Sequence, residues 1–114
     1  YTLSLHDALP IYDPITGSAT WGSEVGEVLP YDIDDLDDLD TVVFSEAGGT
    51  GPIDATGTTI IGMIGWEQQI TVCCVDPFDI TAVVVDGGSE TVRIEVSVLH
   101  NGKEITRLPW IAPR

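Results

Sequence analysis

The stretch TVRIEVSVLHNGKEITRLPWI, residues 91–111, decides the fold. Between residues 91 and 99, apolar side chains alternate strictly with polar ones: Val92, Ile94, Val96 and Val98 share one face. A period of two is typical of a half-buried strand in an antiparallel sheet. Asn101-Gly102 follows and predicts a tight hairpin, because both residues accept a positive φ. The return strand is expected over 104–111, at a sheet edge or ended by Pro109, since proline lacks the N–H that a neighbouring strand needs.

A second strand is expected over residues 66–75, WEQQITVCCV. One face carries Trp66, Ile70, Val72 and Cys74, and the other carries Glu67, Gln69, Thr71 and Cys73. Asp76-Pro77 ends this strand, and a short apolar run, ITAVVV (80–85), comes after it. The sequence therefore predicts a mainly β fold: a small antiparallel sheet that ends in an Asn-Gly hairpin, with long loops.

Cys73 and Cys74 are adjacent in the predicted strand. Because neighbouring strand residues point to opposite faces, one thiol should enter the core and the other should face outward. The sequence has no CxxC or histidine-rich spacing of the kind that binds zinc. A structural role is therefore expected for both cysteines.

Residues 31–40, YDIDDLDDLD, hold six aspartates. The spacing of Ile33, Leu36 and Leu39 predicts a short helix or a turn-rich segment with these three side chains packed inward. Carboxylate oxygens are the ligands that calcium prefers, so Asp32, Asp34, Asp35 and Asp37 are candidate calcium ligands. The EF-hand pattern fails, because counting from Asp32 places an aspartate at position six and a valine at position twelve. A solvated acidic face without metal is the alternative.

The charge balance narrows the classes of partner. The chain has four basic and nineteen acidic residues, a net charge of −15, and its basic residues all lie within the last 22 positions. Most of such a surface repels phosphate, so nucleic acid is excluded as a partner. This acidity is typical of an extracellular, high-salt or calcium-rich setting, or it serves solubility alone. No residues show the nucleophile–base pattern of an enzyme, and no cofactor is expected apart from the calcium alternative.

Residues 1–11, YTLSLHDALPI, match the translation of a short-read sequencing adapter. We expect them to be an artefact rather than natural protein, and the alternative is a genuine apolar strand. The chain then divides into residues 12–59, a loop-rich acidic segment, and residues 60–114, the antiparallel sheet. That sheet has an apolar face, and we expect at most one short helix here to cover it. A long amphipathic helix upstream of residue 12 is therefore expected.

The order of short motifs carries a resemblance to a family. It runs from a Gly22–Glu27 loop to Asp32-Ile33-Asp34-Asp35, Gly65-Trp66, Val75-Asp76-Pro77, a strand over 93–98 and Asn101-Gly102. Over roughly residues 12–108 the chain resembles the C-terminal globular domain of type IV pilin-like proteins. Within that family it is most similar to minor pilins and type II secretion pseudopilins with a prepilin-type cleavage and methylation motif.

The resemblance implies a non-catalytic structural subunit of a pilus or pseudopilus that acts by fibre assembly. Its partners would be other pilin or pseudopilin subunits and the inner membrane, reached through an N-terminal helix. The protein would lie in the cell envelope, on the periplasmic or extracellular side, anchored in the membrane when full-length. Some pseudopilins hold a structural calcium. The alternative is a small acidic extracellular β-domain that acts as a binding or adhesion module, and an enzyme fragment is disfavoured.

Overall fold

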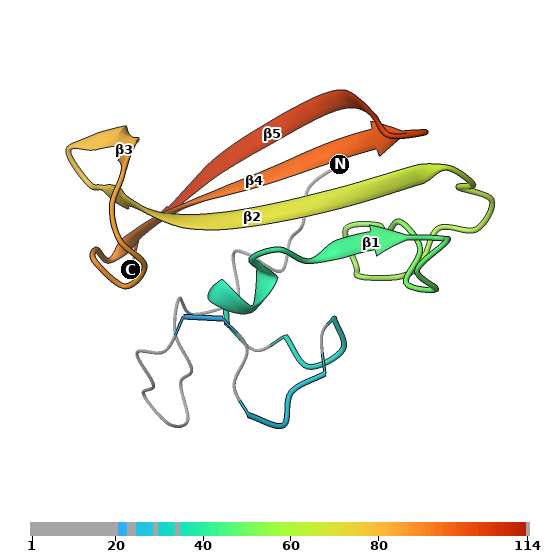
Figure 1. The fold of residues 1–114 in the computed structure, drawn as a ribbon, viewed down its shortest axis with the longest axis horizontal. Helices are drawn as coiled ribbons and strands as arrows, with labels where there is room; N and C mark the ends of the chain where they lie inside the picture. The colour runs from blue at the N-terminus through green and yellow to red at the C-terminus, as the bar shows by residue number, and fades with distance from the viewer. Residues whose placement is uncertain (1–20, 23–24, 29, 34, 114) are drawn as a thin grey trace.

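The computed structural model describes residues 21, 22, 25–28, 30–33 and 35–113. The expectations for residues 1–11 therefore lie outside the described residues. The elements are a 3₁₀ turn, η2 (Asp37–Leu39), and the strands β1 (Val43–Ser45), β2 (Trp66–Asp76), β3 (Asp79–Val83), β4 (Thr91–His100) and β5 (Lys103–Pro113). The strands form one antiparallel sheet in the order β1-β2-β4-β5, with β3 paired to the end of β2 (Figure 1). The mainly β prediction is confirmed.

The predicted hairpin joins β4 and β5. Asn101 and Gly102 have φ values of 51° and 80°, as a two-residue turn of this kind requires. Pairing shifts by one residue between Val98 and Leu99, so the hairpin contains a bulge close to its turn. β5 lies at the edge of the sheet and continues past Pro109, which confirms the edge position that this proline indicated.

The sheet buries one apolar face. Ile70 lies opposite Val96, Val72 opposite Ile94, and Cys74 opposite Val92. All six side chains are at most 2% exposed. Cys73 points the other way and is partly exposed, and both cysteines are free thiols. The prediction of one inward and one outward cysteine is confirmed.

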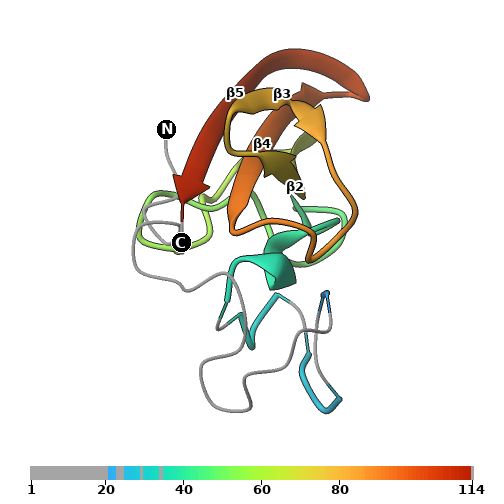
Figure 2. The same cartoon turned by 90° about the vertical axis from the view of Figure 1, so that its left-hand side faces the viewer.

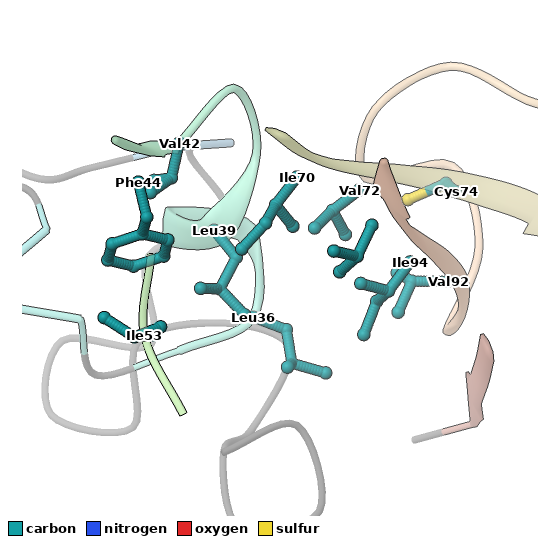
Figure 3. Packing of buried hydrophobic residues seen from close by; sticks show 11 residues of the cluster. Leu36, Leu39, Val42, Phe44, Ile53, Ile70, Val72, Cys74, Val92 and Ile94 are labelled. Atoms are coloured by element: carbon teal, nitrogen blue, oxygen red, sulfur yellow. The ribbon is translucent and has the colours of Figure 1, made fainter. Parts of the chain in front are cut away.

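The described chain itself covers most of this face, through the short acidic segment that contains η2. Leu36 and Leu39 are 1% and 0% exposed and belong to the same core cluster as Ile70 and Ile94. Figure 2 shows η2 close beneath the sheet, and Figure 3 shows both leucines among the core side chains. The predicted turn segment with inward leucines is therefore confirmed, and its packing supplies the second layer that the sheet needs.

The acidic segment also contributes a strand that the sequence did not predict. β1 lies within the part expected to be loops, and Phe44 pairs with Gln68 of β2 while remaining only 4% exposed. The nearby loop is fixed by the Gln68 side chain, which accepts the Ile53 N–H and donates to the Ile53 carbonyl, both at 2.9 Å. Gln68 thus imitates a strand neighbour for this loop and satisfies its buried polar groups.

Candidate functional site: a buried aspartate cluster

Within the acidic segment, residues 36–40 form a tight turn that packs against the sheet. The turn is closed by N–H···O bonds from Leu39 to Leu36 (3.2 Å) and from Asp40 to Asp37 (3.1 Å). Because Leu36 and Leu39 are three residues apart in this turn, both point into the core. The same geometry carries the adjacent carboxylates below the surface: Asp35, Asp37 and Asp38 are 0%, 1% and 0% exposed. The pair of leucines therefore fixes three acidic side chains in a buried position.

Asp35 and Asp37 each use one oxygen to hold the backbone. Asp35 Oδ1 accepts the N–H of Asp38 at 3.3 Å, and Asp37 Oδ2 accepts the N–H of Gly22 at 2.9 Å. The other two oxygens, Asp35 Oδ2 and Asp37 Oδ1, are buried and accept no hydrogen bond. Unsatisfied buried oxygens of a carboxylate are costly when the group is charged.

The cost is relieved by retaining a proton. Burial, followed by the hydrogen bond with Asp37 and the charge of Asp37, raises the pKa of Asp35 to about 9. Burial also raises the pKa of Asp37, although its hydrogen bond with Asp35 opposes that rise. A pKa of about 9 means that the Asp35 carboxyl group keeps its proton at neutral pH.

Asp40 ties the same segment to the sheet. Its Oδ1 accepts the N–H of Val72 in β2 at 2.9 Å, and its Oδ2 accepts the indole N–H of Trp21 at 3.1 Å. Trp21 packs against the core cluster. One carboxylate therefore joins three parts of the chain that are remote in sequence.

The four predicted calcium ligands have different fates. Asp35 and Asp37 lie together and are buried, whereas Asp32 is exposed and accepts the Val28 N–H at 2.8 Å. Asp34 lies outside the described residues. Within the described ranges, no group of three or more acidic, histidine or cysteine side chains is arranged to hold a metal ion. Calcium binding stays a prediction, while the alternative of a solvated acidic face is wrong for Asp35 and Asp37.

Sequence reasoning missed the roles of Asp38 and Asp40. Both belong to the same run of aspartates, and composition alone gives no reason to separate the buried members from the exposed ones. For Asp38 the spacing of Leu36 and Leu39 was the available signal, because a turn that buries two leucines also draws in the residues between them. Asp40 lies after Leu39, and the spacing gives no signal for it.

A second feature is an apolar pocket of about 180 Å³ at the start of β2, which we call the β2 pocket. It is lined by Pro52, Ile60, Met63, Trp66, Gln68 and Val98, together with Glu67. His100 stacks on Trp66 with ring centroids 4.4 Å apart, and it is half-buried rather than free in solvent. Gly65 (φ 79°) lets the β4–β5 turn come close to the start of β2: its carbonyl accepts the Asn101 N–H at 2.8 Å, and a Cβ at this position would collide with the Asn101 side chain.

Comparisons of the chain with known protein families, with curated proteins and with solved structures found no match. No helix formed by the described residues is long and apolar enough to cross a membrane.

Proposed function

We propose that this chain is the globular part of a non-catalytic structural subunit of a pilus or pseudopilus, of the type IV or type II secretion kind, which acts by fibre assembly. The proposal rests on the order of motifs along the chain, on the antiparallel sheet with its Asn-Gly hairpin, and on the apolar face of that sheet.

The observation that carries the proposal is the incomplete cover along β5. Leu108 lies opposite Val96 and Trp110 opposite Ile94, so both point to the apolar face. Val96 and Ile94 are at most 1% exposed, but Leu108 is 36% exposed and Trp110 is only partly buried. The acidic segment thus covers β2 and β4 better than β5. An amphipathic helix from an upstream segment would bury the remaining apolar row.

The gene upstream of residue 12 provides the test. We expect a Phe-Thr-Leu-x-Glu motif and then about twenty apolar residues, the length of one membrane-spanning helix. A preceding β-domain with a linker would instead support the adhesion-module alternative and contradict the proposal.

A functional test uses the full-length protein. Leu108→Asp places a charge where the helix would pack, so we expect loss of incorporation into the fibre while the protein is still produced and membrane-bound. Ile61→Asp, at a position 95% exposed in the loop before β2, is the matched control and should assemble normally. Normal assembly of Leu108→Asp would contradict the proposed packing.

A further inference from the structure

One end of β2 carries an exposed aromatic side chain, and the other end carries an apolar pocket. The β2–β3 connection is a two-residue turn, Pro77-Phe78, closed by the pairing of Asp76 with Asp79, and we call it the Phe78 turn. Phe78 is 98% exposed, which is unusual for so large an apolar side chain. The β2 pocket lies at the other end of the same strand, where Trp66 begins it. Figure 1 shows these ends at opposite sides of the long axis of the molecule.

The Phe78 turn is held in shape before any contact forms. Asp76 Oδ1 accepts the Phe78 N–H at 2.8 Å, and Asp79 Oδ1 accepts both the N–H and the hydroxyl of Thr81 at 3.1 and 2.6 Å. These local bonds fix the backbone on both sides of the aromatic ring. A rigid exposed aromatic side chain loses little conformational entropy on binding, which is the property of an interface anchor.

The size and polarity of the β2 pocket fit one aromatic ring. Its volume is about 180 Å³, and an apolar cavity of ~150 Å³ in a protein can hold a benzene molecule. Ile60, Met63, Trp66 and Val98 supply apolar walls, and Ile60 is 36% exposed at the rim. The pocket therefore offers burial for a side chain of the Phe78 kind.

The charges at the two ends are complementary as well. The Phe78 turn is flanked by Asp76 and Asp79. Arg93 lies at this end too, since its Nη1 donates to the Ile80 carbonyl at 3.0 Å, but its charge is paired with Glu95 at 3.2 Å. At the pocket end, Lys103 pairs with His100 across the β4–β5 turn, and His100 stacks on Trp66 of the pocket. Lys103 forms no ion pair with the described residues, whereas Arg93 and Arg107 are bound to Glu95 or Glu104. Lys103, the one cation of the described residues without an ion pair, thus lies at the pocket end of the sheet, where it offsets the charge of Glu67 in the pocket lining and attracts an acidic turn.

We infer that the Phe78 turn of one copy docks into the β2 pocket of the next copy. The two surfaces are different and lie at opposite ends of a molecule 39 Å long, so the contact is heterologous and builds a linear array rather than a closed dimer. This inference rests on the proposed fibre-forming function, in which packed helices would hold subunits at high effective concentration. A contact made by one aromatic anchor is weak alone and is strengthened by that tethering.

Complementation between two variants tests the inference. Phe78→Asp removes the aromatic ring from the turn but keeps the pocket, and Ile60→Asp places a charge in the pocket but keeps the turn. Both positions are exposed, so we expect both variants to fold, as circular dichroism would verify. By sedimentation velocity at ~1 mM protein, we expect the unmodified chain to form a concentration-dependent series of oligomers, and each variant alone to associate at least tenfold more weakly. A mixture of the two should form a 1:1 dimer that grows no further.

Two further variants sharpen the result. Ile61→Asp, next to the pocket residue but not part of the pocket lining, should associate like the unmodified chain. Lys103→Glu should weaken association, because it replaces the cation at the pocket end with an anion. A monomeric unmodified chain at ~1 mM, an unaltered Phe78→Asp variant, or a mixture without dimer would overturn the inference.

The outcomes separate this contact from the proposed function. An upstream helix in the gene together with no end-to-end association would contradict the inferred contact and leave the pilus proposal standing. End-to-end association in a protein whose gene encodes no such helix would contradict the pilus proposal and support the inferred contact.

Discussion

The protonated Asp35 makes stability depend on pH in a direction that is unusual for an acidic residue. Its pKa is raised from 3.8 to about 9, so the folded protein holds a proton that the unfolded chain releases. This contribution to stability is complete below pH 3.8 and is lost as the pH rises toward 9. Between pH 5 and pH 8 the loss amounts to at most ~4 kcal/mol, at ~1.4 kcal/mol per pH unit. Relaxation of the segment around the charge reduces the expected loss to ~2 kcal/mol.

Asp35→Asn removes this dependence. The asparagine Oδ1 can accept the Asp38 N–H, and its amide group can donate to Asp37, so the variant imitates the protonated acid. We expect equal stability of the variant and the unmodified chain at pH 5, and a gain of ~2 kcal/mol for the variant at pH 8. Urea unfolding followed by tryptophan fluorescence at pH 5, 6, 7 and 8 measures both curves.

Asp54→Asn is the matched control, because it removes one negative charge from an exposed loop. Hydrogen bonds from Thr56 and Thr58 lower the pKa of Asp54, so its titration lies below the pH range of the experiment. The control should therefore run parallel to the unmodified chain. If the stability of Asp35→Asn also ran parallel to it between pH 5 and pH 8, the buried proton would be refuted.

Other outcomes follow from the same packing. Leu39→Ala should cost ~3 kcal/mol in urea unfolding, whereas Ile61→Ala should change stability by less than ~0.5 kcal/mol, and equal effects would mean that the acidic segment does not cover the sheet. Asp40→Ala leaves a β2 amide and an indole N–H without their acceptor and should cost ~2 kcal/mol, with Asp40→Asn restoring part of the loss. Iodoacetamide should modify Cys73 before the buried Cys74. The reaction of Cys73 should be slow at pH 8, because burial raises the pKa of its thiol. If mass spectrometry found Cys74 modified first, the assignment of the two strand faces would be wrong. If the sequence prediction of calcium binding is correct, calcium should raise the melting temperature relative to chelator, and superimposable curves would remove it.

Local signals were sufficient for the parts of the fold that depend on neighbouring residues. The alternation of Val92, Ile94 and Val96 and the Asn101-Gly102 pair located the hairpin correctly, because side-chain period and turn conformation are set within a few residues. The positions of Leu36 and Leu39 likewise predicted an inward-facing turn. Pro109 indicated an edge strand for the equally local reason that it has no N–H to donate.

Contacts between segments far apart in the sequence decided the buried aspartates, β1 and the β2 pocket. Asp35 and Asp37 are buried because the sheet packs against them. Aspartate is usually exposed in proteins, so a run of aspartates in the sequence favours the prediction of a solvated face. β1 forms because β2 offers an unpaired edge, and the β2 pocket forms because a loop at residue 52 meets strand residues at 66 and 98.

The amino-acid sequence by itself determined strands β2, β4 and β5, the hairpin, the orientation of the cysteines and the inward leucines, since each follows from short-range periodicity and backbone preference. The tertiary structure alone decided which carboxyl groups keep a proton, where the sheet finds its cover, and which apolar surfaces stay open. Those properties depend on removal from water by residues far away in the chain, and no local pattern encodes that removal.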